Sequence, residues 1–353
     1  MAAVVGGDQA AHAARVPPRG SHRGHLFFVL SAFLLALPFL AETDGRRRTS
    51  VSDYLQRRAL RILPLYWTAV CLGTVLSART AADLLRGVPY LLFLNALHGW
   101  FTPLEPYSTV WWSLVTEVEF YLVLPVLGIA RRSPTGRRLG AVALGLYTLA
   151  YGAFLMGWVH LASIGGQVHL IVSAFGFGPV FLCGIAAAAL YSRYGEAVRS
   201  ELRRRPWVRN GGADLALVAV VVGLGRLLQW AAFQGWERAS AAPRTVWHTL
   251  EGALWSVVVL LLLVAPCRVK PLLCNRVLVV LGVLSYSIYL IHLPVLIGAV
   301  NAVHAKRPVA LQGWTPLTVV VMAGAALATV ALSAITYRVI ERPFLVKKAR
   351  IDG

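Results

Sequence analysis

Long apolar runs separated by short polar segments dominate the chain. Most runs are long enough to cross a hydrocarbon core of about 30 Å as a helix, and lipid leaves no other partner for backbone N–H and C=O groups. We therefore predict transmembrane helices at 26–41, 60–78, 110–130, 139–158, 168–191, 213–233, 247–266, 277–299 and 315–337. The run at 84–97 is short for a full crossing, so we expect a re-entrant or interfacial helix there. The pattern predicts an all-α polytopic membrane protein with about nine transmembrane helices.

Basic residues predict the orientation of these helices. Lys and Arg gather in the polar segments at 42–59, 131–138, 192–212, 267–276 and the carboxyl-terminal tail. By the positive-inside rule these segments lie in the cytoplasm, while 98–109 and 159–167, which contain neither Lys nor Arg, lie outside. Successive polar segments alternate between the cytoplasm and the outside only if 84–97 does not cross the membrane. The polar leader at 1–25 then lies outside, although it carries three arginines of its own.

Composition agrees with a membrane protein and argues against a nucleic-acid-binding protein. The chain is 58% hydrophobic and 14% charged, whereas a soluble domain averages about 45–50% and about 25%. In a soluble protein the formal charge of +19 would indicate a nucleic-acid partner, but here the charges lie in short loops that meet anionic headgroups. We expect a lipid bilayer as the surroundings, no nucleic acid and, from the cysteine spacing, no metal site.

The chain is expected to have three parts. The leader at 1–25 has no apolar run and is predicted to be disordered. Residues 26–345 form the membrane-embedded domain, and residues 346–353 form a cytoplasmic tail.

Ionisable groups within or beside the spans are candidate functional residues, because burying them without a partner costs several kcal/mol. In YLQRRALRILPLYW, Arg57 and Arg61 share a helix face and Arg58 lies beside them. Guanidinium groups bind phosphate well, so these arginines suit a phosphorylated donor such as a coenzyme A thioester. They also suit a positive anchor for the helix, which residue type alone favours.

Two carboxylates lie inside the predicted span VWWSLVTEVEFYLVLP. Glu117 and Glu119 point to different faces, and Glu117 shares a face with Tyr121. Such a carboxylate can act as a general base or orient one. The alternative is a structural ion pair with Arg226, which lies deep in the run VVGLGRLLQW. Arg226 needs one of these carboxylates, Glu251 or an anionic substrate as its partner.

The segment LGVLSYSIYLIHLPV contributes a histidine. Ser285, Tyr289 and His292 lie at helical spacing and can line one face of their helix. His292 is either a hydrogen-bonded packing residue or part of an active site. The segment YRVIERPFL closes the last span, and by itself it is an ordinary helix end with basic flanks.

Five of these segments, in the same order, resemble acyltransferase family 3, the integral-membrane O-acyltransferases that modify sugars, lipids, polysaccharides and macrolides. They are LFFVLSAFLL, RRALRILPLYW, WWSLVTEVEFYLVLP, LSYSIYLIHLP and YRVIERPF, and the set extends over residues 25–345. The resemblance implies an acyl-CoA donor on the cytosolic side, no tightly bound cofactor, and a hydroxyl-bearing acceptor such as a sugar, lipid or macrolide. It also implies the cell membrane as the location.

The resemblance assigns roles to individual residues. Donor binding falls to Arg57, Arg58, Arg61 and Tyr66. The acceptor pocket is lined by Trp112, Ser113, Tyr121, Arg226 and Tyr289. Glu117 and His292 become catalytic candidates.

The family's general base is a histidine that ends a first span, ahead of the LFFVLSAFLL segment. Here the residues before that segment are polar, and we expect an altered amino terminus without that span. Of His12, His22 and His25, His12 falls nearest the family spacing and is the candidate replacement base. Two alternatives stay open. One is a catalytically inactive acyltransferase-like paralogue, and the other is a transporter that uses buried Glu117, Arg226, Glu251 and His292.

Overall fold

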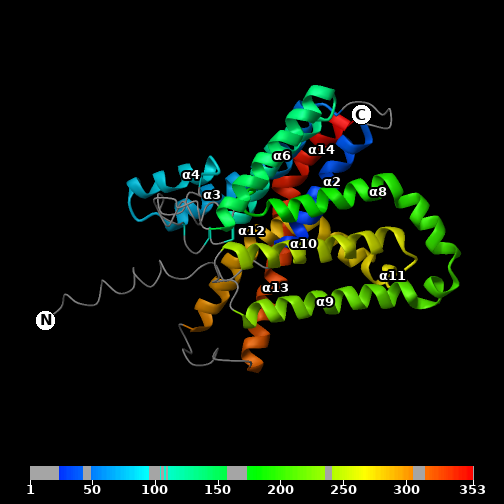
Figure 1. The fold of residues 1–353 in the computed structure, drawn as a ribbon. Helices are drawn as coiled ribbons and strands as arrows, with labels where there is room; N and C mark the ends of the chain where they lie inside the picture. The colour runs from blue at the N-terminus through cyan, green and yellow to red at the C-terminus, as the bar shows by residue number, and fades with distance from the viewer. Residues whose placement is uncertain are drawn as a thin grey trace. The chain divides into compact units, whose positions relative to one another are not determined.

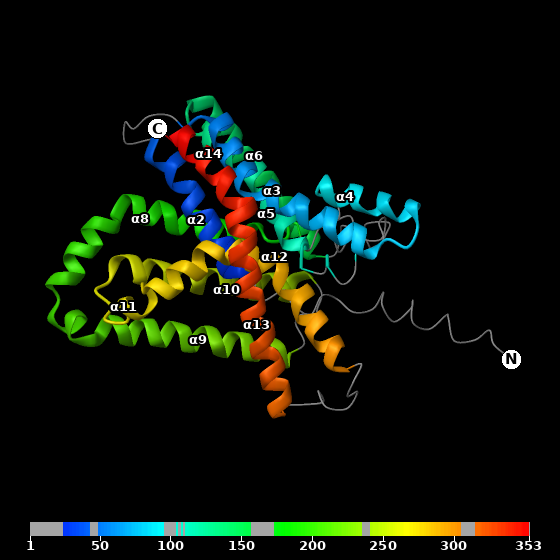
Figure 2. The ribbon, with the colours of Figure 1, turned by 180° about the vertical axis from the view of Figure 1, so that it is seen from behind.

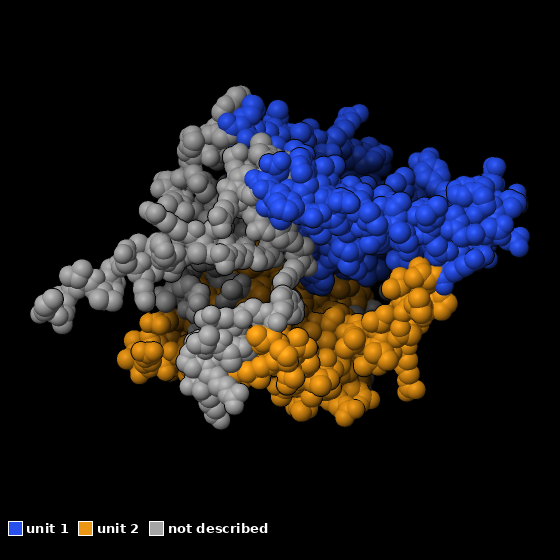
Figure 3. All heavy atoms as spheres, turned by 90° about the horizontal axis from the view of Figure 1, so that it is seen from below, with its two compact units in different colours: residues 1–46, 127–160, 175–268 blue, residues 47–126, 161–174, 269–353 orange. Residues whose placement is uncertain are grey.

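The computed structural model describes residues 24–42, 49–94, 104, 107–108, 110–156, 173–234, 241–304 and 315–352. Helices account for most of these ranges, and no β-strand occurs within them, which confirms the predicted all-α class. The chain divides into two compact units, drawn in different colours in Figure 3. Unit 1 comprises Met1–Arg46, Leu127–His160 and Phe175–Arg268, and unit 2 comprises Arg47–Val126, Leu161–Ala174 and Val269–Gly353.

Unit 1 is built around two closely packed helices, α2 (His25–Ala41) and α8 (Gly178–Arg204). Its other helices are α6 (Pro134–Leu155), α9 (Ala213–Phe233) and α10 (Ala241–Val264). Helix α2 packs against α8 and α10, and α10 also contacts α9 (Figures 1 and 2). A Cβ added to Gly184 would lie 2.6 Å from the Val29 carbonyl oxygen and 2.7 Å from the Ala32 Cβ. Only glycine therefore permits this approach of α8 to α2.

A short kinked turn joins α8 to α9. It covers Val208–Gly212, where Asn210 and Gly211 leave the helical conformation, and Gly211 has a φ of 110°, a left-handed conformation that favours glycine. The Arg268 guanidinium donates to the Arg209 carbonyl oxygen over 3.1 Å. This contact fastens the basic turn to the segment that follows α10.

Unit 2 is arranged around α3 (Val51–Ser77) and α12 (Arg276–His304). The Tyr286 hydroxyl on α12 donates to the Ile62 carbonyl oxygen on α3 over 2.8 Å. The remaining elements that lie wholly in the unit are η3 (Ala81–Gly87), α4 (Val88–Leu91), α11 (Lys270–Leu273), α13 (Pro316–Thr336), the π-helical segment η6 (Tyr337–Glu341) and α14 (Arg342–Asp352). Helix α13 packs on α12, and α14 packs on α3. Helix α5 (Trp112–Ala130) contributes its residues up to Val126.

Seven of the described helical stretches are long and apolar enough to cross a membrane. They are Val51–Ser77, Trp112–Ala130, Pro134–Leu155, Val208–Phe233, Thr245–Val264, Arg276–Val303 and Pro316–Lys347. The predicted span at 26–41 forms the shorter apolar helix α2, which has 17 residues. The predicted span at 168–191 falls partly outside the described residues, and its described part is a turn up to 177 followed by α8, whose second half is rich in charged residues. The predicted number of nine is therefore not confirmed.

At two places the observed helices differ from the predicted ones, and the local sequence explains why. Helix α3 begins at Val51 rather than at 60, because the Ser50 hydroxyl caps it by accepting from the Asp53 N–H over 3.3 Å. In the short run at 84–97, the described part contains only the end of η3 and the single turn α4. Both are far shorter than a membrane crossing requires.

Candidate active site: two buried polar clusters

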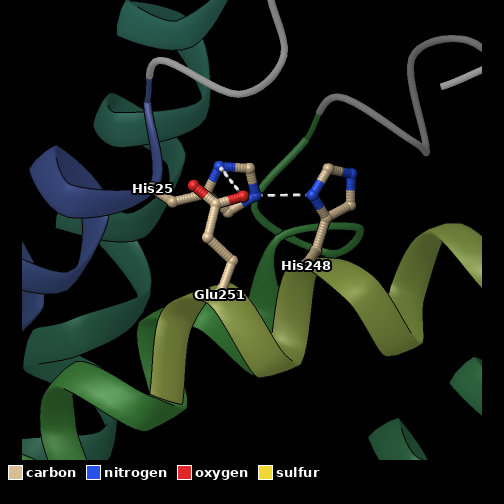
Figure 4. A group of neighbouring side chains, drawn as sticks. All are labelled: His25, His248 and Glu251. Carbon is tan, nitrogen blue, oxygen red and sulfur yellow. Dashed lines mark hydrogen bonds and ion pairs between the residues drawn. The ribbon is translucent and has the colours of Figure 1, made fainter. Parts of the chain in front are cut away.

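The histidine cluster in unit 1 consists of His25, His248 and Glu251. His25 is the first residue of α2, whereas His248 and Glu251 lie three positions apart on one face of α10. The His25 Nε2 lies 2.5 Å from the His248 Nδ1, and the His25 Nδ1 lies 3.3 Å from a Glu251 carboxylate oxygen (Figure 4). The imidazole of His25 therefore bridges the carboxylate and the second imidazole.

Apolar and aromatic side chains enclose the histidine cluster. The exposed fractions of His25, His248 and Glu251 are 0%, 5% and 1%. The Phe177 ring lies 5.5 Å from the His25 ring, and the Trp247 ring lies 4.5 Å from the His248 ring, centroid to centroid. In such surroundings the interactions between these polar groups are stronger than in water, and a group left without a partner would be costly.

The two imidazoles meet edge to edge. Their ring planes differ by 26° with centroids 4.5 Å apart, so the facing nitrogens lie close to both ring planes, as an N–H···N hydrogen bond requires. Among the described residues, these three are the ones whose side chains could hold a metal ion, with ligand atoms within 4.8 Å of one another. Two nitrogens 2.5 Å apart leave no room for a cation on the line between them, because each N–metal bond is about 2.0–2.1 Å long. These two nitrogens therefore contact each other directly rather than through an ion between them.

Sequence reasoning missed most of this cluster. The sequence offers His25 only as a lesser candidate for the replacement base and Glu251 as a partner for Arg226 or part of a transport path, and it gives His248 no role. The two α10 residues stand in the pattern H-x-x-E near the start of an apolar helix, which places both on one face and was the available signal. Nothing local could indicate the partnership with His25, which lies 223 positions away along the chain.

The tyrosine cluster in unit 2 consists of Arg58, Ser113, Glu117, Tyr121 and Tyr289. Glu117 accepts a hydrogen bond from the Tyr121 hydroxyl, so the predicted sharing of a helix face is confirmed. The Ser113 and Tyr289 hydroxyl oxygens lie 2.7 Å apart, and Tyr289 also donates to the backbone carbonyl of Val110. These residues come from α3, α5 and α12, so three of the predicted motifs meet at one place.

Arg58 gives the tyrosine cluster its positive charge. The carbon at the centre of its guanidinium lies 5.9 Å from the ring centroids of both Tyr54 and Tyr121. Its Nε atom is buried and has no hydrogen-bond partner within the described part of the chain. A buried N–H donor without an acceptor is costly, so this group is suited to meet an anionic or carbonyl oxygen of a ligand.

The other donor-site candidates have mixed surroundings. The buried Tyr66 hydroxyl donates to the Tyr90 carbonyl oxygen over 3.0 Å, and its ring stacks on Phe93 with centroids 4.6 Å apart. Tyr66 therefore holds α4 against α3, and its hydroxyl is already engaged. Arg57 and Arg61 are half-buried on α3. Arg61 lies within electrostatic range of buried Glu341, which accepts a hydrogen bond from Ser287.

Of the remaining candidates, His292 lies beside Tyr289 of the tyrosine cluster, with ring centroids 6.2 Å apart, and His12 lies outside the described residues. His292 is half-buried, and its Nδ1 lies 2.8 Å from the Tyr289 carbonyl oxygen and 3.2 Å from that of Ile288, both on its own helix. Arg226 is exposed on α9, and Glu251, one of its three expected partners, pairs with His25 instead. Trp112 is half-buried at the start of α5.

Glu119 differs from its neighbour Glu117. Its carboxylate accepts a hydrogen bond from the Ala174 backbone N–H over 2.7 Å. A backbone donor thus meets this carboxylate and ties α5 to the segment that contains Ala174.

Comparison with known proteins identifies relatives over most of the chain. The family model described as an acyltransferase domain matches residues 23–338. Nodulation protein 10 of Rhizobium leguminosarum bv. viciae is 26% identical over 341 residues, which cover 90% of this chain and 80% of that protein. Acyltransferase MdmB of Streptomyces mycarofaciens is 31% identical over 135 residues, which cover 36% of this chain and 33% of that protein. No solved structure matches the chain.

Proposed function

Because the chain belongs to acyltransferase family 3, we propose that it transfers an acyl group from acyl-CoA to the hydroxyl of a sugar, lipid or macrolide-type acceptor. The proposed location is the cell membrane, in keeping with the seven apolar helices long enough to cross a bilayer. The name of one relative, acyltransferase MdmB, states the same type of reaction.

One observation carries the proposal, namely the meeting of three separate motifs in the tyrosine cluster. Arg58, Glu117 and Tyr289 lie far apart along the chain, yet their helices bring them into one connected set with Tyr121 and Ser113. A transport path would also collect buried charges, but it gives no reason for the hydrogen-bonded hydroxyl groups of Ser113 and Tyr289 beside a guanidinium. Acyl transfer uses such groups to hold a thioester and to stabilise the oxyanion that forms from it.

In the proposed reaction, α3 supplies the positive charge for the donor. The half-buried Arg57 and Arg61 lie four positions apart on the same face and would bind the phosphates of coenzyme A. Arg58, held between two tyrosine rings, would contact an oxygen closer to the thioester. Glu117 keeps Tyr121 in place through their hydrogen bond, and it thereby fixes one of the rings beside Arg58.

The test measures donor use and product together. Membranes that contain the protein are incubated with radiolabelled acetyl-CoA and three acceptors: an alkyl glycoside, a lipid with a free hydroxyl, and a macrolide. We expect label in at least one acceptor and release of an equal amount of coenzyme A thiol. Arg58→Gln should reduce this release at least about tenfold, whereas Arg86→Gln should not, because Arg86 is exposed on η3 and pairs with Asp83.

Two results would contradict the proposal. One is the absence of both acetyl-CoA binding and thiol release in a protein that is monodisperse and folded. The other is transport of an acceptor across the membrane without any acylated product, which would support the transporter alternative instead.

A further inference from the structure

We propose that the turn between α8 and α9 in unit 1 (Figure 1) binds the headgroups of anionic phospholipids at the bilayer surface. We call this site the arginine turn and define it by Arg203, Arg204, Trp207, Arg209 and Arg268. This binding is independent of the proposed function, because it involves neither the donor nor the acceptor of acyl transfer. The turn lies on the side that the charge pattern predicts to be cytoplasmic, where anionic lipids give the membrane surface a negative potential.

The positive charge of the turn is exposed and mostly uncompensated. The segment RRRPWVRNGGA contains four arginines and neither aspartate nor glutamate. Arg205 pairs with Glu201, with guanidinium nitrogen and carboxylate oxygen 2.6 Å apart. The side chains of Arg203, Arg204 and Arg209 are exposed, and within the described ranges no carboxylate lies at ion-pair distance from them. A guanidinium can bind two oxygens of one phosphate, so these three side chains suit phospholipid headgroups.

A further guanidinium comes from the segment after α10. Arg268 lies 59 positions from Arg209 along the chain, yet one of its nitrogens donates to the Arg209 carbonyl oxygen over 3.1 Å. A guanidinium carries five N–H donors, and the Arg268 side chain is exposed, so its remaining donors can meet a headgroup phosphate. Two segments that are distant in the sequence thus bring positive charge together at one place in unit 1.

An exposed tryptophan lies beside the arginines. The side chain of Trp207 has an exposed fraction of 64%, although indole is largely apolar. Gly212 leaves room for it, because a Cβ there would lie 2.4 Å from Cε3 of the Trp207 ring. The stretch Val208–Phe233, which is long and apolar enough to cross a membrane, begins at the next residue. Trp207 therefore belongs at the level of the headgroups, where tryptophan is enriched in membrane proteins.

The arginines and the indole together indicate a lipid surface as the occupant. A soluble phosphate compound would be bound by the arginines alone, and it gives no reason for an exposed indole at the end of a span. A bilayer surface uses both, because the arginines meet the headgroup phosphates while the indole lies at the boundary with the acyl chains. The positive-inside rule explains the sign of this charge, but it explains neither Trp207 nor the return of Arg268 to Arg209.

The first experiment measures lipid binding to the whole protein. Native mass spectrometry of the detergent-purified protein gives its affinities for phosphatidylglycerol and for phosphatidylcholine. We expect phosphatidylglycerol to bind at least about tenfold more tightly, and the preference to fall as the ionic strength rises. Arg203→Gln, Arg204→Gln and Arg209→Gln combined should lower the affinity for phosphatidylglycerol about 100-fold, at about fivefold for each arginine. Equal affinities of the wild type for the two lipids would overturn the proposal.

A second triple variant is the matched control. Arg131, Arg137 and Arg138 are also exposed in a basic loop of unit 1, and replacing all three by glutamine changes the net charge equally. This variant should change the affinity for phosphatidylglycerol less than about threefold, because a charge that does not contact the headgroup contributes little. Equal losses in the two triple variants would overturn the site, since net charge alone would then account for the binding.

Trp207 supplies a readout that leaves every arginine in place. In lipid nanodiscs, the difference between the wild type and Trp207→Phe isolates the fluorescence of Trp207. Brominated phosphatidylglycerol should quench this fluorescence at least about twice as strongly as brominated phosphatidylcholine, because the arginines enrich the anionic lipid beside the ring. Equal quenching by the two lipids would contradict a preference for anionic headgroups at the turn.

Soluble phosphate compounds provide the last comparison. Inorganic phosphate and coenzyme A, each at the same concentration as phosphatidylglycerol, should not displace the lipid from the protein. Displacement by either compound would mean that the turn is a site for soluble phosphates, and the assignment to lipid would be wrong. None of these readouts measures acyl transfer, so failure of the proposed function would leave the lipid site standing, and loss of the lipid site would leave the acyltransferase standing.

Discussion

Glu251 in unit 1 and Glu117 in unit 2 are both buried carboxylates on apolar helices, with exposed fractions of 1% and 2%. Their neighbours differ in chemistry. Glu251 lies 3.3 Å from one imidazole, which in turn contacts a second imidazole, and imidazole ordinarily exchanges protons near neutral pH. Glu117 faces a phenol beside a guanidinium, groups that keep their protons near neutral pH. The first cluster thus combines a carboxylate with two imidazoles, and the second combines a carboxylate with a phenol and a guanidinium.

The largest expected effect tests whether the tyrosine cluster depends on its carboxylate. Glu117→Gln should lower kcat/KM for acyl transfer by about 100-fold, or about 2.7 kcal/mol, because the strong acceptor of the Tyr121 hydroxyl is weakened. Steady-state kinetics with acetyl-CoA measure the change, and the protein should stay monodisperse.

Glu119→Gln is the matched control for this change. A glutamine at 119 still offers an oxygen to the Ala174 N–H, so activity should stay within about twofold of the wild type. Equal losses of activity in both variants would show that both carboxylates in α5 are needed. The special role of Glu117 in the tyrosine cluster would then be wrong.

A smaller effect sharpens the assignment of donor binding to unit 2. Arg61→Ala should raise the KM for acetyl-CoA about tenfold, or about 1.4 kcal/mol, with little change in kcat. The comparison substrate is S-acetylpantetheine, which has the thioester but no phosphate. Its KM should be unchanged by the substitution, and a rise with both substrates would mean that Arg61 supports the fold through buried Glu341 instead.

The smallest effect concerns Asp83, a carboxylate outside both clusters. Its substitution shows how much a carboxylate contributes when it lies in neither cluster. Asp83 on η3 accepts from the backbone N–H groups of Arg79 and Thr80, each over 2.9 Å, and these bonds hold its pKa below the ordinary value. Because the folded-state pKa is lowered, its contribution to stability is present above the ordinary aspartate pKa and is lost as the pH falls through the lowered value.

Asp83→Asn should therefore lower the thermal midpoint slightly at neutral pH and leave activity unchanged. The difference from the wild type should disappear in strongly acidic buffer, which melting curves at several pH values can measure. A difference of the same size at all pH values would mean that shape, and not charge, accounts for the contribution of Asp83.

The sequence predicts local relations well and distant ones poorly. The apolar runs locate most helices, and the four-residue spacing of Glu117 and Tyr121 predicts their shared face, because both depend only on helix periodicity. The meeting of His25 with His248 depends on how α2 packs on α8 and α10, and the close approach at Gly184 shows how specific that packing is. Periodicity contains no information about such a contact between distant segments.

The π-helical segment Tyr337–Glu341 has a consequence for the ancestry of this chain. A π turn takes up one residue more than an α turn while the helix continues in the same direction, so it absorbs a single inserted residue. Alignments of relatives should therefore show a gap of one position at this place. Deleting Val339 should be tolerated far better than deleting a residue within the regular turns of α13, where every later side chain would rotate by about 100°.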